Sequence, residues 1–280
     1  MDTLPVHSLE VPPTLSVVLT CYNLGAYLEE ALASIPDRAD MEVIVVDDGS
    51  TDPATQDVVS RLDRSRYTVI EQANMGLARA RNNGIQRASG LYILPLDADN
   101  RIRPVFLERA ISVLDTNPDV GVVYGDAQYF GERTGRWVVG PYDFDRLLRG
   151  NYIDACACYR RTEWERAGGY DEHMPYMGWE DWDIWLRFSA LGVQFHYVAE
   201  VFFDYRVRTG SMIQETRLRY NELVQYIFSK PSLRFLFPVR ENLLDRPLPI
   251  KEEISGRELL RMLIGRLRVR LFRGTSGAGN

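Results

Sequence analysis

Short apolar, β-branched runs alternate with segments of helical periodicity through the first part of the chain. Residues 15–20 form the first run and residues 41–46 the second. Between them, residues 26–35 carry apolar side chains at helical spacing, and Pro36 marks the end of this predicted helix. A strand, a helix and a second strand in succession predict a right-handed βαβ unit in a parallel sheet.

The alternation continues as far as an acidic turn that begins at Asp97. The pattern predicts helices over 54–63, 76–88 and 104–114, and strands over 67–71, 91–96 and 120–124. Because Pro95 lacks an N–H group, we expect it at the exit of its strand rather than in the middle. Regular alternation ends near residue 125, and a late helix is predicted from Asp181 to Leu191. The fold class is therefore α/β, with a mixed, mostly parallel sheet flanked by helices.

Length and composition fit a globular protein with one large domain. The chain has 280 residues, 45% of them hydrophobic and 26% charged, and a formal net charge of -6. The net negative charge argues against nucleic acid as the main partner. We predict a main domain over 14–212, an N-terminal extension over 1–13, and a helical, basic segment over 213–280. No signal peptide or membrane-spanning stretch is apparent in the sequence, so a cytoplasmic protein is expected.

The three cysteines do not form a disulfide or zinc pattern. Their number is odd and none are spaced as CxxC, which favours a reducing compartment. Cys156 and Cys158 lack further ligands at the usual zinc spacing, so we predict that they are buried in the core.

Polar residues follow three of the predicted parallel strands where these end. They are Thr20-Cys21-Tyr22-Asn23, Asp47-Asp48-Gly49-Ser50 and Asp97-Ala98-Asp99-Asn100. Ligands bind at such strand ends, and two acidic exits in one crevice need a cation. Carboxylate oxygens suit Mg²⁺ or Mn²⁺, whose coordination is completed by phosphate oxygens and water. The pattern therefore predicts a metal-bound diphosphate.

The Asp-x-Asp pattern by itself is weak evidence for a metal. It also occurs at Asp143-Phe144-Asp145 and Asp181-Trp182-Asp183, and only Asp97 and Asp99 follow a predicted strand. A solvated turn is the alternative interpretation for this pair. For Asp47 to Ser50, the alternative is a β-turn followed by a helix N-cap.

Several sequence blocks, in a fixed order, resemble the inverting glycosyltransferases of family 2. The blocks are VVLTCYN at 17–23, VVDDGSTD at 45–52, GLARARNNG at 76–84 and LDAD at 96–99. Two later blocks, GGYDE at 168–172 and EDWDIWLR at 180–187, resemble the acceptor side of that family. The resemblance covers residues 14–212 and implies a GT-A fold. It also implies direct transfer from a nucleoside diphosphate sugar, with inversion at the anomeric carbon.

The resemblance assigns roles to residues at the strand exits. Thr20, Tyr22 and Asp48 would hold the nucleoside of the donor, with Asp48 facing the nucleobase. Asp97 would lie near the ribose or the metal, and Asp99 would be the direct ligand of Mn²⁺ or Mg²⁺. The metal would screen the charge that develops on the diphosphate leaving group.

Two arginines in the predicted helix after Gly76 point in different directions. Arg81 matches the family's Ala-Arg-Asn motif and would brace the crevice or approach the diphosphate. Arg79 fits equally well as a solvated charge on the helix surface. The pattern therefore leaves open whether each arginine has a role at the site or is a solvated charge.

The resemblance places the general base at Asp181, with Trp179 and Glu180 on the acceptor side. An inverting transfer needs one base that deprotonates the acceptor hydroxyl. The alternative for Asp181 is a charge that merely stabilises a helix N-terminus. On either interpretation, we expect the helix dipole to lower the pKa of Asp181 and keep it ionised.

The chain departs from the family pattern at two points. Arg208 stands where a family stretch often has His, and a guanidinium cannot ligate a metal, although it can hold a diphosphate. The Gln-x-x-Arg-Trp motif of processive members is absent, which favours transfer of a single sugar.

The resemblance also indicates the substrates, although it does not identify the sugar. We expect a UDP-sugar donor and a carbohydrate or lipid-linked acceptor. Leucines and arginines over 257–270 predict a basic amphipathic helix, which either lies on an anionic membrane or packs on the main domain.

The alternative functions are a sugar nucleotidyltransferase and a non-catalytic protein that binds a nucleotide sugar or a glycan. A dehydrogenase is disfavoured because G-x-G-x-x-G is absent.

Overall fold

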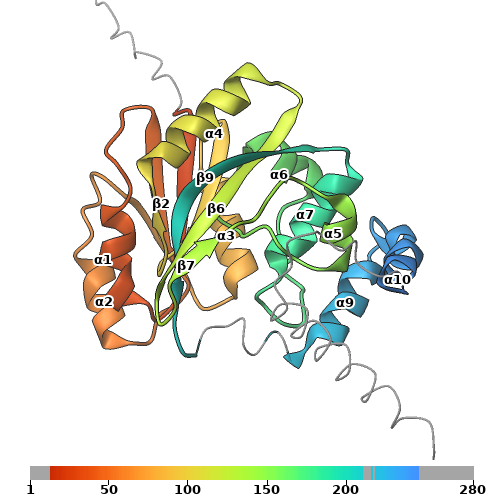
Figure 1. Ribbon diagram of the computed structural model, residues 1–280. Coiled ribbons are helices and arrows are strands. Elements are labelled where there is room, and N and C mark those ends of the chain that lie inside the picture. Colours follow the sequence, from red (N-terminus) through yellow and green to blue (C-terminus); the bar gives the residue numbers. More distant parts are fainter. Residues whose placement is uncertain (1–12, 211–215, 217, 246–280) are drawn as a thin grey trace, which may run out of the picture. The chain divides into compact units, whose positions relative to one another are not determined.

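The computed structural model describes residues 13–210, 216 and 218–245 (Figure 1). The chain divides into two compact units, one that ends at Arg240 and one that begins at Glu241. The predicted basic helix over 257–270 lies outside the described residues, and the division at residue 212 stays a prediction. In the described part of the chain, no helix combines the length and the apolar character that a membrane span requires.

Strands and helices alternate regularly up to β4 and less regularly thereafter. The strands are β1 (Leu15–Cys21), β2 (Met41–Asp47), β3 (Thr68–Glu71), β4 (Tyr92–Asp97), β5 (Arg101–Ile102), β6 (Val120–Gly131), β7 (Gly135–Trp137), β8 (Cys158–Arg160) and β9 (Gln194–Val207). The helices are α1 (Gly25–Ala33), α2 (Pro53–Ser60), α3 (Leu77–Arg87), α4 (Pro104–Thr116), α5 (Phe144–Arg149), α6 (Arg161–Ala167), α7 (Glu180–Ala190), α9 (Tyr220–Ser229) and α10 (Phe237–Asp245), with a 3-10 turn η1 (Arg234–Leu236).

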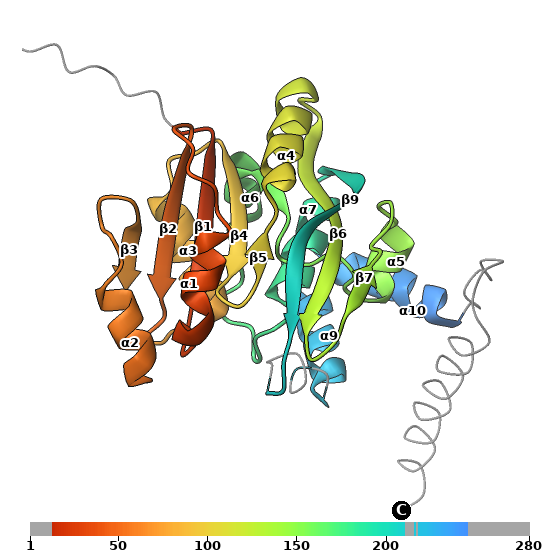
Figure 2. The same cartoon turned by 60° about the vertical axis from the view of Figure 1, so that its left-hand side comes forward.

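These strands form one mixed sheet, which confirms the predicted α/β class. Within the described residues the strand order is β3-β2-β1-β4-β8-β6-β9-β5, and β7 pairs with β6. Strands β3, β2, β1 and β4 are parallel, so their arrowheads point to one edge (Figure 2). Strand β8 runs antiparallel to β4 and β6, whereas β6 and β9 are parallel to each other.

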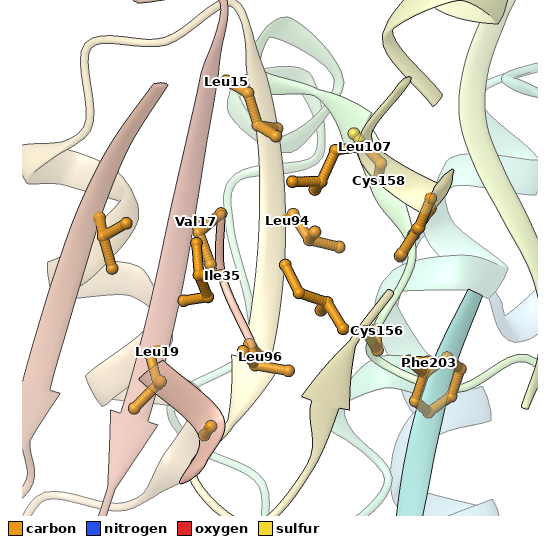
Figure 3. Packing of buried hydrophobic residues seen from close by; sticks show 14 of the residues in the cluster. Leu15, Val17, Leu19, Ile35, Leu94, Leu96, Leu107, Cys156, Cys158 and Phe203 are labelled. Carbon is orange, nitrogen blue, oxygen red and sulfur yellow. The ribbon is translucent and has the colours of Figure 1, made fainter. Parts of the chain in front are cut away.

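Helices cover both faces of the parallel part of the sheet. Alternate residues of β1 and β4, such as Val17 and Leu94, pack in the main hydrophobic cluster with apolar residues of α1 and α4 (Figure 3). On the opposite face α3 lies against β1 and β2, where Val18 and Val46 approach Gly84. Strand side chains alternate between the two faces, so these β-branched runs are buried on both sides.

The prediction for Pro95 was wrong, because this residue lies inside β4. The N–H groups of Tyr92 and Ala98 donate to the carbonyl oxygens of Thr14, just before β1, and Thr20, so the even-numbered positions of this segment face β1. Pro95 therefore faces the β8 side, where β8 pairs only with Tyr92 and Ile93. The missing N–H group of proline leaves no ladder bond unmade at this position.

The end of the alternating pattern near residue 125 did not mark the end of a strand. Strand β6 continues to Gly131 and pairs with β9 along most of its length. The pairing shifts register between Gly125 and Asp126 and again between Asp126 and Ala127. A bulge of this kind interrupts the period of two on which the sequence pattern depends.

Cys156 and Cys158 belong to the hydrophobic cluster, as predicted (Figure 3). All three cysteines are buried and unpaired. Burial raises the pKa of the Cys158 thiol, so it remains protonated at neutral pH and serves as a small apolar side chain.

Close packing between α3 and β1 gives a stability prediction for Gly84. A Cβ atom at this position would lie 2.4 Å from Cγ1 of Val18. We expect Gly84→Ala to lower the unfolding midpoint in thermal melts, since overpacking costs about 1–3 kcal/mol and exceeds the roughly 0.5–1 kcal/mol gained in helix propensity. Gly150→Ala is the matched control, because no atom lies within 4 Å of its Cβ position. Equal midpoints for the two variants would contradict the packing argument.

Candidate active site

The predicted polar exits lie together at the carboxyl edge of the parallel strands. In the sheet register, Thr20 of β1 lies opposite Asp97 of β4, and Cys21 lies opposite Asp47 of β2. The N–H group of Asp48 donates to the carbonyl oxygen of Cys21 at 2.9 Å. This edge of the sheet therefore brings together three sequence blocks that are separated by more than 20 residues.

Asp48 organises the backbone that enters α3. Its Oδ1 atom accepts hydrogen bonds from Nε2 of Gln72 at 2.8 Å and from the N–H group of Met75 at 2.9 Å. Its Oδ2 atom accepts from the N–H group of Gly76 at 2.9 Å. Gly76 has φ = 91°, a conformation that glycine adopts without strain. The carboxylate thus fixes the segment that precedes α3. Its expected contact with the nucleobase of the donor stays a prediction.

Thr20 and Tyr22 occupy different environments at the same exit. Thr20 is buried, and its Oγ1 atom meets no hydrogen-bond partner among the residues that the structure describes. Tyr22 is 44% exposed. A buried hydroxyl without a partner is costly, so Thr20 is suited to a polar ligand at this edge.

The turn after β4 is tied to the end of β9 by two arginines. The N–H group of Asn100 closes the turn on the carbonyl oxygen of Asp97 at 3.0 Å. Nε of Arg206 donates to the carbonyl oxygen of Asp99 at 3.0 Å, and Nε of Arg208 donates to Oδ2 of Asp99 at 2.9 Å. Burial and the neighbouring Asp97 raise the pKa of Asp99, against the opposing effect of Arg208.

The residues of this turn fit a divalent cation in chemical type. Asp97 uses Oδ1 to bind Arg81, and Asp99 uses Oδ2 to bind Arg208. The second oxygen of each carboxylate is not engaged by these arginines, and carboxylate oxygens are hard ligands. Across the described ranges, no group of three or more potential ligands comes together, so a cation here would complete its shell with water and phosphate oxygens.

Arg81 joins the acidic turn to the start of α7. Its side chain is 1% exposed, donates from Nη2 to Oδ1 of Asp97 at 2.7 Å, and donates from Nη1 to Oε1 of Glu180 at 2.6 Å. Burial disfavours the charged guanidinium, but Asp97 and Glu180 outweigh this effect and raise the pKa of Arg81. Arg79 is 49% exposed and lies 3.5 Å from Glu172. Of the two roles predicted for Arg81, a bracing role matches these contacts with Asp97 and Glu180.

Residues at the start of α7 are buried around Asp181. Trp179 precedes the helix, and its ring lies edge-on to those of Trp182 and Tyr220. Glu180 accepts from Arg81 and from the N–H group of Gly178. These contacts are internal to the protein, so an acceptor-side role for Trp179 and Glu180 stays a prediction.

The expected direction of the Asp181 pKa was wrong. Burial raises the pKa of Asp181 well above the ordinary value, and Glu180 and Asp154 raise it further. Arg81 and the N–H group of Trp182 lower it, but their effect is smaller. A helix N-terminus stabilises a carboxylate only modestly, whereas desolvation and two like charges act together.

Two polar residues near Asp181 were missed by sequence reasoning. Nδ2 of Asn151 donates to Oδ2 of Asp181 at 2.7 Å. Asp154 accepts from the N–H group of Cys156 at 2.9 Å, and burial, together with the charge of Asp97, raises its pKa to about 7. Both residues lie in the irregular segment between α5 and β8. No periodicity or turn motif marked this segment in the sequence.

The chain belongs to glycosyl transferase family 2. The model of that family matches residues 16–170, more than half of the 280-residue chain. The amylovoran biosynthesis glycosyltransferase AmsE of Erwinia amylovora is 29% identical over 220 residues, which span 74% of this chain and 80% of that protein. Other matches span less of the relative: 24% of the length of one, and 35% of the length of another, where the match covers 39% of this chain. The family resemblance drawn from the sequence blocks is confirmed.

Solved structures show the same fold. Crystalline S. aureus TarS 1–349 in complex with UDP-GlcNAc is 18% identical, with a TM-score of 0.64 over 82% of this chain and 70% of that chain. Mannosyltransferase PcManGT from Pyrobaculum calidifontis, in complex with GDP-Man and Mn²⁺, is 21% identical, with a TM-score of 0.59 over 92% of this chain and 81% of that chain. The predicted GT-A fold is thereby confirmed.

The different environments of the two α3 arginines give a paired prediction. Arg81→Met leaves two carboxylates at the crevice without their shared cation, so we expect the free energy of unfolding to fall by about 3–5 kcal/mol. Arg79→Met removes an exposed ion pair and should cost less than about 1 kcal/mol. Urea denaturation of both variants measures the difference. Similar losses for the two variants would show that the buried bridge contributes no more than a surface pair.

Proposed function

We propose that this chain catalyses the inverting, metal-dependent transfer of a single sugar from a nucleoside diphosphate sugar to an acceptor hydroxyl. The observation that carries the proposal is the Arg81 bridge. It connects the acidic turn at Asp97, which is suited to the diphosphate end of a donor, with Glu180 beside Asp181. The bridge thus links the proposed leaving-group site to the residue that precedes the proposed base.

In the proposed reaction, Asp181 receives the proton of the attacking hydroxyl. The acceptor oxygen forms a bond to the anomeric carbon while the bond from that carbon to the diphosphate breaks on the opposite side. Burial and the neighbouring carboxylates raise the pKa of Asp181. A base whose pKa lies closer to the working pH accepts a proton more readily in the transition state.

The donor side of the proposal depends on Asp99, Asp97 and Arg208. The two carboxylates would hold Mn²⁺ or Mg²⁺, which supplies Lewis-acid stabilisation of the diphosphate when bound. Arg208 is paired with Asp99 and is positioned to offer its remaining N–H groups to phosphate oxygens. Thr20, Tyr22 and Asp48 are proposed for the nucleoside, because they follow β1 and β2 at the same edge of the sheet.

Related structures support a nucleotide-sugar donor without defining the sugar. TarS 1–349 was solved in complex with UDP-GlcNAc and PcManGT in complex with GDP-Man. We propose a UDP-sugar as the first donor to test and a carbohydrate or lipid-linked saccharide as acceptor. We also propose a cytoplasmic location, where nucleotide sugars are available as donors.

A contact with the membrane through residues 257–270 is a separate proposal. Liposome pelleting of the chain with and without the residues after 250 tests it.

A thermal-shift panel tests donor binding directly. We expect one of UDP-, GDP- or dTDP-sugars to raise the unfolding midpoint, and Mn²⁺ to increase the shift, because a ligand at 100 times its Kd stabilises the native state by about 2.7 kcal/mol. Asp99→Asn should reduce the increment due to Mn²⁺, whereas Asp145→Asn, in an exposed Asp-x-Asp pattern, should not. A panel in which no donor shifts the midpoint would argue against the proposed function.

The base assignment predicts a specific kinetic defect. Asp181→Asn keeps the size of the side chain but cannot accept the proton, so kcat should fall by about 10²–10⁴-fold. The donor-induced thermal shift should stay close to that of the wild type, because Asp181 lies on the acceptor side in this proposal. Turnover of Asp181→Asn at the wild-type rate would refute the assignment.

A further inference from the structure

Two tryptophan side chains of α7 hold α5 and the segment that follows it, residues 150–157. Nε1 of Trp182 donates to the carbonyl oxygen of Leu147, at the end of α5, at 2.7 Å. Nε1 of Trp185 donates to the carbonyl oxygen of Ile153 at 3.2 Å. Both tryptophans are fully buried. The polar residues of this segment therefore have defined positions relative to the start of α7.

Asn151 of this segment contacts Asp181 directly. Its Nδ2 atom donates to Oδ2 of Asp181 at 2.7 Å, while Oδ1 of Asp181 accepts from the N–H group of Trp182 at 2.7 Å. Each carboxylate oxygen is thus held by one donor. Since a carboxylate oxygen has two acceptor sites, either oxygen can still accept the proton of a hydroxyl.

The other end of the Asn151 amide is buried and unpaired. Its Oδ1 atom accepts no hydrogen bond from any residue that the structure describes. A buried carbonyl oxygen without a donor is unfavourable, and native proteins rarely retain one without a reason. A hydroxyl of a substrate bound beside Asp181 would supply the missing donor.

Charged groups from three elements act on Asp181. Glu180 on α7 and Asp154 on the segment over 150–157 disfavour its ionised form, whereas Arg81 on α3 favours it. Tyr170 and Tyr205 also lie within electrostatic range of Asp181, and burial keeps both phenols neutral. The N–H group of Asn151 donates to the carboxylate and so favours the charged form, which is the form that a base needs.

We propose that Asn151 is a positioning residue for the base: its amide N–H group orients Asp181, and its amide oxygen accepts a hydrogen bond from a second hydroxyl of the acceptor. This inference rests on the proposed function, in which Asp181 is the base. It also specifies the acceptor class. The attacking hydroxyl would have a neighbouring hydroxyl, as in a saccharide or another polyol, rather than stand alone.

Two variants of Asn151 separate positioning from packing. Asn151→Asp has the same shape but replaces the donor with a carboxylate, and Asn151→Ala removes the amide altogether. Loss of the donor raises the pKa of Asp181, so the acidic limb of the rate profile should move to higher pH by about one unit in Asn151→Ala and further in Asn151→Asp. A new carboxylate beside Asp181 raises its pKa whatever the role of the amide, so the decisive variant is Asn151→Ala: a role in packing alone would leave its acidic limb at the wild-type pH.

The measurements are the pH dependence of donor hydrolysis and the carboxyl ¹³C NMR titration of Asp181, assigned by its loss in Asp181→Asn. The donor is the nucleotide sugar that binds in the thermal-shift panel. Asn117→Ala, an exposed asparagine at the end of α4, is the matched control and should behave as the wild type. Unchanged titration of Asp181 in Asn151→Ala would overturn the positioning role.

Simple alcohols test the proposed contact with a second hydroxyl. With the same donor, the wild type should transfer sugar faster to ethylene glycol than to ethanol, and Asn151→Ala should lose this preference. Absence of a preference in the wild type would overturn the role of the amide oxygen. Full turnover by Asp181→Asn would instead refute the base assignment in the proposed function, whereas inactive Asp181→Asn with an unshifted Asn151→Ala refutes the present inference alone.

Discussion

The ion bridge made by Arg81 is the interaction on which the rest of the candidate site depends. One buried guanidinium binds Asp97 at the end of β4 and Glu180 at the start of α7, residues that lie 16 and 99 positions away in the chain. Burying these charges is unfavourable unless all of them are present and paired. The acidic turn and the start of α7 are therefore fixed relative to each other only when α3, β4 and α7 have all packed.

The candidate site has an excess of acidic side chains. Asp97, Asp99, Asp154 and Asp181 act on one another, as the raised pKa values of the last three indicate. Arg81 is already engaged by two carboxylates, and it cannot neutralise all of them. In the proposed function, this imbalance would disfavour a bare diphosphate and favour one that arrives with a divalent cation. The same imbalance raises the proton affinity of Asp181.

Membership in glycosyl transferase family 2 accounts for the fold. Two residues of this chain, Arg208 and Asn151, each hold an acidic side chain of the candidate site by a hydrogen bond. Arg208 binds Asp99, so in the proposed function one side chain would couple the cation site to the contact with the diphosphate. Asn151 contacts Asp181 from a segment with no regular secondary structure. Arg208 and Asn151 each donate a hydrogen bond to a carboxylate and so affect its orientation and its pKa, and neither adds a reactive group to the site.

The sequence alone determined the βαβ alternation, the acidic exit at Asp97 and the block at Glu180, because strands and short motifs are governed by local periodicity and residue type. Tertiary structure decided the bridge through Arg81, the contact of Asn151 with Asp181, and the continuation of β6 past its bulge. It also reversed the expected pKa shift of Asp181. Burial and the charges of distant residues determine that pKa, and neither quantity is encoded in the local spacing of residues.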